Sequence, residues 1–393
     1  MMNRKIGTTA QGIRLPIINR GDDLAPIVVD ALTQALTQAN QTLHQSDVIG
    51  VTEAIVAKAQ NNFATIDDIA ADVRQKFGEN STVGVVFPIL SRNRFYNMLK
   101  GIARGAAKVI VLLQYPSDEV GNPIMDLDRL DEIEDKLPGG LISAQAFREA
   151  AGSFAHPFTG MDYIDLYESV GEHVEVYLSK DPRDIVKLTD KVLVAEIHAR
   201  ARTRRRVVNA GAKTVYTLSD ILNHSINGSG YNPDFGLLGS NLADAETLKL
   251  FPRDCMPFVE RLQQLIAEKT GVRPEVMIYG DGAFKDPFCG IWELADPVVS
   301  PAYTERLGGR PNEIKLKYVA ETVFGQMGKD EKQEAVTQMI RTKNETGNGY
   351  AEGTTPRKYA DLLGSLCDLM SGSGDKGTPV ILIQGYFDDY ATE

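Results

Sequence analysis

Apolar residues recur along this chain in two patterns, one typical of helices and one of buried strands. The spacing from Leu24 to Ala39 is helical, and the aspartates just before it can cap the helix. Three later segments also have largely helical spacing, at residues 248–270, 314–342 and 359–370. Three Val- and Ile-rich runs predict buried strands, at residues 47–58, 276–279 and 379–384. Helices and strands therefore share the chain, and we expect an α+β fold.

A strand, a helix and a second strand follow one another between residues 83 and 115. Ser91 is a suitable N-cap for the helix, which should run to about Arg104, and the pattern suits a βαβ unit. The glycine-rich residues 137–161 are expected to connect two lobes. Residues 181–202 have helical spacing and are expected to lead into a strand at 203–211.

Composition places the chain among ordinary globular proteins. It has 393 residues, 43% of them hydrophobic, which is enough for a sizeable core in two or three lobes. The formal net charge of -11 disfavours non-specific attraction to nucleic acid or to an anionic membrane. No apolar run approaches the roughly 20 residues that cross a bilayer. Cys255, Cys289 and Cys367 are widely spaced, as in a reducing compartment, so we expect buried thiols and a cytoplasmic protein.

The sharpest candidate for chemistry is Asp281, which stands between two glycines directly after a predicted strand. Ligands bind at strand ends in α/β folds, and a carboxylate flanked by glycines suits Mg²⁺ or Mn²⁺ facing phosphates. A simple Asp-Gly turn explains the same residues equally well.

Two loops add further candidates. Residues 371–377 (SGSGDKG) could form a nest of backbone N–H groups for an anion, with Asp375 and Lys376 beside it, although flexible linkers have the same composition. Residues 232–241 hold Asp234, Ser240 and Asn241. These side chains could meet a nucleotide or a metal, or they could belong to a plain asparagine-rich turn.

Two groups of arginines could bind anions. Arg92 and Arg94 lie at a predicted helix N-terminus, where N–H groups attract anions, and we expect them to shape an acceptor site; the alternative is that they are simply solvated. A basic run could hold a polyanionic substrate, but such runs more often form a solvated face: Arg200, Arg202, Arg204, Arg205 and Arg206. The five histidines form no HExxH motif and no evident triad.

Taken in order, these segments resemble the coenzyme F420-0:gamma-glutamyl ligase family. GIRLPIINRGDDL resembles the family's opening nucleotide-contacting segment, DVIGVTEAIVAKAQ its strand ending in a Lys-Ala pair, and KDPR its Asp-Pro-Arg helix start. GLLGSN matches the loop ending in Ser-Asn, VMIYGDGAF the metal-binding strand end, and DKGTPVILIQG the closing strand. Residues 83–165 lie outside the resemblance.

The resemblance implies two intertwined lobes of mixed sheets with flanking helices. The ligase core would comprise residues 1–82 and 166–393, with residues 83–165 as an inserted βαβ-like segment. Asp281 would bind metal. Leu238 and Ser373 stand where the family has acidic metal ligands, and Asp234 and Asp375 are close enough in sequence to replace them. Contacts to GTP would come from these residues: Leu15, Pro16, Ile17, Ile18, Glu53, Lys58, Asn241, Gly372, Gly374, Lys376 and Gly377.

The activity implied by the resemblance is a GTP- and metal-dependent amide ligase. It would add an amino acid, glutamate by the resemblance, to a small-molecule carboxylate acceptor through an acyl phosphate, and it would act as a homodimer without nucleic-acid or membrane partners. Two other functions remain open. One is a metal-dependent hydrolase or phosphatase, in which Asp281 helps to activate water. The other is a non-catalytic nucleotide- or cofactor-binding protein.

Overall fold

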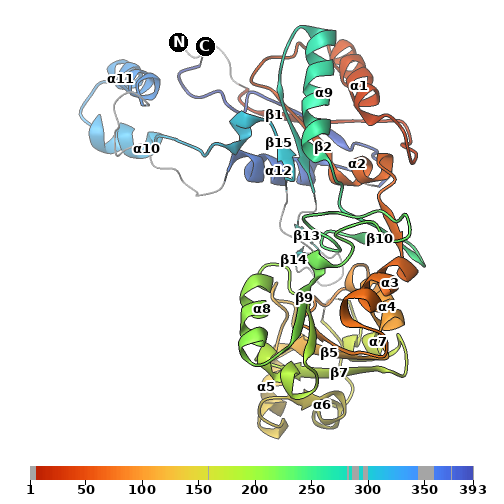
Figure 1. Ribbon diagram of the computed structural model, residues 1–393. Coiled ribbons are helices and arrows are strands. Elements are labelled where there is room, and N and C mark those ends of the chain that lie inside the picture. The colour runs from red at the N-terminus through yellow and green to blue at the C-terminus, as the bar shows by residue number, and fades with distance from the viewer. Residues whose placement is uncertain are drawn as a thin grey trace.

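The computed structural model describes residues 6–392, with gaps at 158, 281–282, 286–291, 295–299, 344–357 and 373. Its upper part in Figure 1 is built on a five-stranded sheet in the order β1-β16-β2-β12-β15. The strands are β1 (Thr9–Ile13), β16 (Val380–Gln384), β2 (Val48–Thr52), β12 (Glu275–Tyr279) and β15 (Ala302–Tyr303). Only β2 and β12 pair in parallel. The sheet is therefore mixed, as expected for an α+β fold.

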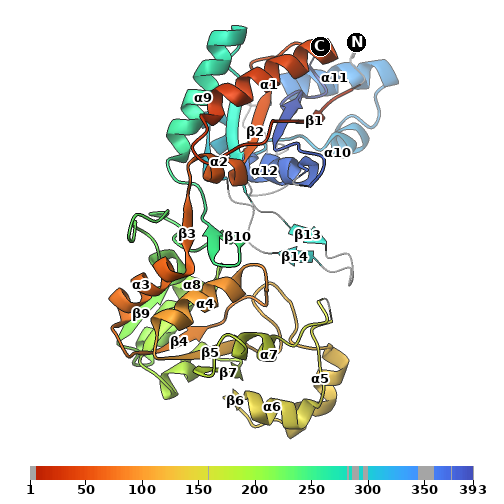
Figure 2. The same ribbon diagram turned by 90° about the vertical axis from the view of Figure 1, so that its right-hand side faces the viewer.

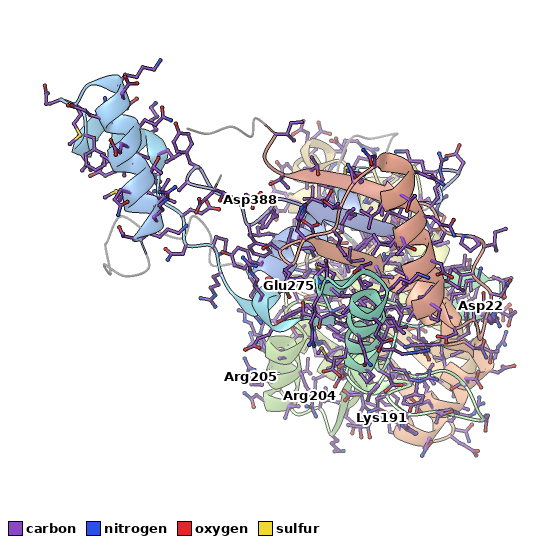
Figure 3. All side chains as sticks on the ribbon, turned by 90° about the horizontal axis from the view of Figure 1, so that it is seen from above. Asp22, Lys191, Arg204, Arg205, Glu275 and Asp388 are labelled. Atoms are coloured by element: carbon purple, nitrogen blue, oxygen red, sulfur yellow. The ribbon has the colours of Figure 1, made fainter. Side chains whose placement is uncertain are left out.

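Helices cover both faces of this upper sheet. Helix α1 (Leu24–Ala39) and helix α9 (Cys255–Thr270) bury their apolar stripes against one face. Helix α12 (Tyr359–Met370) covers the other face. Helix α2 (Glu53–Ala59) follows β2 without a break. A short arm projects from this part in Figures 1 and 3, formed by α10 (Leu316–Tyr318), a π-helical turn (Val319–Val323) and α11 (Lys329–Arg341).

The lower part of Figure 1 holds a six-stranded sheet in the order β6-β7-β5-β4-β8-β9. Its strands are β4 (Thr82–Val86), β5 (Lys108–Gln114), β6 (Ile142–Ser143), β7 (Val174–Ser179), β8 (Lys191–Val194) and β9 (Thr214–Thr217). All pairings are parallel except that of β6. In chain order the parallel strands run 3-2-1-4-5, a doubly wound topology. The sheet that begins in residues 83–165 thus continues through β9.

Helices also cover both faces of the lower sheet. One face packs against α3 (Ile66–Phe77), α4 (Phe95–Gly105), α5 (Leu127–Ile133), α6 (Ala144–Ala151) and α7 (Tyr163–Glu168). The other face packs against α8 (Arg200–Asn209) and the 3-10 turn at Pro182–Lys187. Further 3-10 turns lie at Glu134–Lys136, Leu218–Asp220 and Glu305–Gly308.

Two glycines let α3 and α4 approach closely. A Cβ atom added at Gly101 would lie 2.7 Å from the Ile69 Cβ atom, and one at Gly105 would lie 2.7 Å from the Ala70 carbonyl oxygen. Any larger residue at these two positions would push the helices apart.

A small three-stranded sheet lies between the two larger ones (Figure 2). Its order is β10-β11-β3, and its strands are β10 (Asn241–Asp244), β11 (Thr247–Lys249) and β3 (Phe63–Thr65). A further hairpin joins β13 (Ala283–Lys285) to β14 (Trp292–Leu294). Residues far apart in the chain therefore meet between the upper and lower parts.

Most sequence-based predictions of the upper part are confirmed. The structure has the expected α+β fold, α1 has the predicted bounds, and strands occupy the predicted runs near residues 276–279 and 379–384. The helix predicted at residues 248–270 begins only at Cys255, because Thr247–Lys249 forms strand β11 instead. The Asp23 side chain does not cap α1; it pairs with Arg261 at 2.7 Å.

Four local predictions are wrong. The strand predicted at residues 47–58 ends at Thr52, because Glu53–Ala59 is rich in helix formers, and Lys58 lies on α2. Helix α4 begins at Phe95, and the Ser91 carbonyl oxygen accepts a bond from the Tyr96 N–H group at 3.2 Å instead of Ser91 acting as the N-cap. Residues 137–161 include β6 and α6, so they are part of the lower fold and no mere connection.

The fourth wrong prediction concerns residues 181–211, where helix and strand are exchanged. Residues 191–194 form the buried strand β8, and the arginine-rich residues 200–209 form α8. Buried parallel strands have continuous apolar runs, which periodicity alone does not separate from helices.

Candidate active site

Four segments of the chain meet at one edge of the upper sheet. Because β2 and β12 are parallel, with Tyr279 opposite Thr52, both strands end at this edge. Strand β16 begins here and β1 ends here, since both run antiparallel to their neighbours. Ligands of α/β proteins bind outside the carboxyl ends of parallel strands. The segments that continue from this edge are 14–18, Glu53, Gly280 and 371–379.

Hydrogen bonds tie two of these segments together. The Leu15 N–H group donates to the Gly377 carbonyl oxygen at 3.3 Å, and Arg14 Nε donates to the Lys376 carbonyl oxygen at 3.3 Å. The loop at 371–378 is closed on itself, because Gly372 N–H donates to Thr378 Oγ1 at 3.0 Å and Thr378 N–H to the Gly372 carbonyl oxygen at 3.2 Å. The predicted nucleotide segments 15–18 and 372–377 are therefore neighbours.

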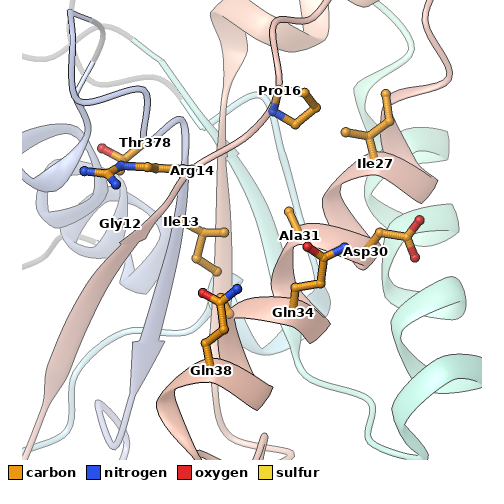
Figure 4. A pocket seen from close by; sticks show the side chains of 11 residues that line it. Gly12, Ile13, Arg14, Pro16, Ile27, Asp30, Ala31, Gln34, Gln38 and Thr378 are labelled. Carbon is orange, nitrogen blue, oxygen red and sulfur yellow. The ribbon is translucent and has the colours of Figure 1, made fainter.

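The exposure of these two loops leaves room for a ligand. Gly374, Lys376 and Gly377 are exposed, and Ile17 is 85% exposed whereas Ile18 is buried. Arg14, Pro16 and Thr378 line an open groove of about 730 Å³ beside α1 (Figure 4). In Figure 4 the Arg14 side chain points toward Thr378, and Gln34 and Gln38 lie across the groove on α1.

A buried ion pair lies at the same edge. Glu53, the first residue of α2, is 1% exposed, and its Oε1 atom lies 2.5 Å from the ammonium nitrogen of Lys249 on β11. Asn241 stands directly opposite Lys249 in the β10–β11 pairing. The structure thus brings Glu53 and Asn241, both predicted nucleotide contacts, to one lysine that the sequence did not single out.

Two glycines, Gly280 after β12 and Gly239 before β10, allow close packing beside the Glu53–Lys249 pair. A Cβ atom at Gly280 would lie 2.9 Å from both the Glu53 Cγ atom and the Phe251 ring, and one at Gly239 would lie 2.8 Å from the same ring. Gly239 also has a φ of +71°, which favours glycine. Next to it, Ser240 is fully buried, and its hydroxyl finds no hydrogen-bond partner among the described residues.

The predicted metal ligands are not assembled in the part of the chain that the structure describes. Asp281 lies outside the described residues. Asp234 and Asp375 are both exposed, on separate loops, and the described ranges contain no group of three His, Cys, Asp or Glu side chains that could hold a metal. Lys58 is half-buried in the last turn of α2.

The lower sheet approaches the same loop from the other side. Arg94 is 9% exposed and lines a small cavity of about 20 Å³ with Ala195 and Ile197, which follow β8, and with Leu238 and Gly239. Arg92 is exposed and is not part of this lining. Strands β4 and β8 are neighbours whose following helices cover opposite faces, which makes their carboxyl ends the topological switch point of this sheet.

Comparison with known proteins decides the family. The family model described as F420-0:Gamma-glutamyl ligase matches residues 12–385 of the chain.

The chain belongs to the F420-0:gamma-glutamyl ligase family.

No curated protein matches the chain. Among solved structures, the biosynthetic arginine decarboxylase SpeA from Campylobacter jejuni aligns at 11% identity over 89% of this chain and 66% of that one, just short of two thirds of its length. The TM-score of 0.13 means that this likeness carries no argument about fold or function. Family membership thus rests on the sequence model, which spans both sheets.

Several other buried polar groups in this ligase-family chain were not predicted from the sequence. Burial raises the pKa of Glu196, which follows β8 and is 5% exposed, and burial likewise raises the pKa of Asp118 after β5. The Glu119 carboxylate accepts hydrogen bonds from three consecutive N–H groups before α8, those of Ile197, His198 and Ala199. One sign in the sequence that Lys249 is unusual is its position within the apolar run TLKLF.

Two of the three cysteines are buried, as expected. Burial raises the pKa of the Cys255 thiol to about 12, with Asp254, Glu53 and Asp234 adding to the effect, and burial also raises the pKa of Cys367. Neither is suited to be a thiolate nucleophile at neutral pH. Cys289 lies outside the described residues. No helix in the described ranges is long and apolar enough to cross a membrane.

Proposed function

We propose that this member of the family is an amide ligase that uses GTP to join glutamate to a small-molecule carboxylate acceptor. The strongest support is that the segment 238–251 contacts both the upper sheet edge and the cavity beside the lower sheet. Phe251 packs against Gly280 and Gly239, and Gly239 in turn lines the cavity of Arg94. A nucleotide at the upper edge and an acceptor at the lower edge would therefore be neighbours.

The reaction has two steps. In the first, an oxygen of the acceptor carboxylate attacks the terminal phosphorus of GTP, which gives an acyl phosphate and GDP. In the second, the amine of glutamate attacks the acyl carbon, the C–O bond to phosphate breaks, and the amine loses a proton, so that an amide and inorganic phosphate remain. Such chemistry depends on positioning and on charge stabilisation more than on a protein nucleophile.

The residues of the upper edge suit the nucleotide part of this reaction. Residues 374–377 of the glycine-rich loop are exposed, and backbone N–H groups of such loops can bind phosphate oxygens. The guanidinium of Arg94 and that of Arg92 are proposed to bind the acceptor carboxylate or another anionic group of the acceptor. Mg²⁺ or Mn²⁺ dependence is part of the proposal and rests on Asp281. We also propose a cytoplasmic homodimer, on the resemblance alone.

The test is a product assay with purified protein. GTP, Mn²⁺, glutamate and the deazaflavin precursor are supplied, and mass spectrometry measures glutamyl addition while a second assay measures GDP. We expect GDP formation that depends on glutamate and a glutamylated product. GDP release independent of any amino acid would instead indicate a hydrolase, and GTP binding without turnover would indicate a binding protein.

A further inference from the structure

A buried lysine at the upper sheet edge has no part in the reaction as proposed so far. The Lys249 side chain is 11% exposed and that of its partner Glu53 is 2% exposed. Removing two charges from water is costly, and replacing such a pair by apolar residues is often neutral or stabilising. A buried pair is therefore weak evidence of a stabilising role.

The position of the pair points to a ligand. Glu53 directly follows β2, whose carboxyl end lies beside that of β12. The two loops at this edge are exposed at Arg14, Pro16 and Ile17 and at residues 374–377. Ser240, one residue before the cross-strand partner of Lys249, buries a hydroxyl without a partner among the described residues. A buried hydroxyl without a protein partner has room for a bond to a bound water or to an incoming group.

Two other residues of interest are less well placed to put a positive charge beside Glu53. Lys58 is five residues after Glu53 on α2, so the two side chains are about 140° apart around the helix axis and lie on different faces. Leu238 stands where the family has an acidic metal ligand, but its buried side chain has no charge and cannot bind a metal cation. Within the described residues, Lys249 is the cation seen in an ion pair with Glu53.

We propose that Lys249 donates to the phosphates of the bound nucleotide and that Glu53 holds its ammonium group in position until the nucleotide binds. This rests on the function proposed above and adds a phosphate-binding residue to it. An ammonium group has three donors, so it can keep one bond to Glu53 while it donates to phosphate oxygens. Away from bulk water, such charge-assisted bonds are stronger than in solvent.

The test compares two double variants by calorimetry with GTP and with guanosine. E53Q/K249M removes the pair without leaving one buried charge alone, and D72N/K76M does the same to a matched pair on α3, whose side chains are 0% and 11% exposed. We expect E53Q/K249M to bind GTP at least about tenfold more weakly than the native protein, with guanosine binding unchanged. D72N/K76M should bind both ligands normally.

The single variant E53Q isolates the lysine, because it keeps the cation and removes its counter-charge. Because Glu53 positions the ammonium group, we expect E53Q to bind GTP more weakly than the native protein but more tightly than E53Q/K249M. Equal GTP affinity in E53Q/K249M and E53Q would overturn the role of Lys249 while leaving the ligase proposal intact. Equal losses for GTP and guanosine would mean a structural role only and would overturn it too. If the native protein binds no GTP, both proposals fall.

Discussion

The carboxyl edges of the two sheets reach the same loop, but they differ in what occupies their anion-binding positions. At the upper edge, residues 374–377 of the glycine-rich loop are exposed to solvent. At the lower edge, the protein fills the corresponding position itself, because the Glu119 carboxylate accepts the N–H groups of Ile197, His198 and Ala199. We therefore propose that phosphates bind at the upper edge, whereas the lower edge offers the Arg94 side chain instead.

This difference supports the proposal that the two substrates bind to two different parts of the fold. A doubly wound sheet is a common place for a nucleotide, and topology alone would favour the lower sheet. The N–H groups of residues 197–199, before α8, argue against a nucleotide there, because the Glu119 carboxylate already accepts their hydrogen bonds. Arg204 and Arg205, farther along α8, lie at the periphery of Figure 3 and are exposed, as solvated arginines are. A fold's topology therefore suggests a site, but its side chains decide which ligand the site can take.

The largest expected effect comes from closing the upper edge with Gly280→Val. The new side chain would collide with Glu53 and with the Phe251 ring, which lie 2.9 Å from the position of its Cβ atom. We expect a destabilisation of about 1 to 3 kcal/mol and at least tenfold weaker GTP binding. Urea unfolding and calorimetry measure the two effects. Gly139→Ala, where a Cβ atom meets nothing within 4 Å, is the control; a G280V protein with native GTP affinity would contradict the site.

Opening the lower edge with Glu119→Ala is expected to cost about 2 kcal/mol, because three N–H groups lose a charged acceptor. The variant should also gain an anion-binding nest. Inorganic phosphate should then raise its midpoint of thermal unfolding more than that of the native protein. Identical phosphate effects on both proteins would show that Glu119 does not occupy an anion position.

Asp281→Asn tests the metal part of the proposal. Loss of one carboxylate ligand should weaken Mn²⁺ binding at least tenfold, about 1.4 kcal/mol, without changing the urea unfolding curve of the metal-free protein. Calorimetry with Mn²⁺ measures the affinity. Asp128→Asn is the comparison and should leave Mn²⁺ affinity unchanged, since Asp128 is exposed and is not among the predicted metal ligands. An unchanged Mn²⁺ affinity in D281N would remove Asp281 as a ligand.

The smallest effect is expected on the lower part alone, from Asp181→Asn. Hydrogen bonds from Arg183 lower the pKa of Asp181 from 3.8 to about 2. A lowered folded pKa means that the ionised group adds stability above pH 3.8, and this stability is lost as the pH falls toward 2. Urea unfolding measured across this range should show a smaller acid loss in D181N than in the native protein. Parallel curves would contradict the assignment.

Sequence reasoning succeeded where local signals agree with the tertiary structure. Helix α1 and strands β12 and β16 were predictable because amphipathic spacing or a buried apolar run lies between clear turns. The segment 181–211 failed because a buried parallel strand and a helix can share one apolar pattern, and only the sheet decides between them. Its doubly wound order depends on pairings between strands far apart in sequence.

The candidate site also contains residues that the sequence predicted and one that it did not. Loops 15–18 and 372–377 could be named from their resemblance to a family, and the sheet then places them side by side. Lys249 could not be found, since its importance comes from Glu53, which lies 196 residues away in the chain. Long-range pairs of this kind leave no periodic signal in a single sequence.

Amide hydrogen exchange with and without GTP tests most directly whether the nucleotide binds at the upper edge. The account predicts slower exchange at residues 14–18 and 372–378 when GTP is added, and unchanged exchange at residues 197–199, whose N–H groups already bond to Glu119. Protection of 197–199 by GTP, with no change in the two upper loops, would contradict it.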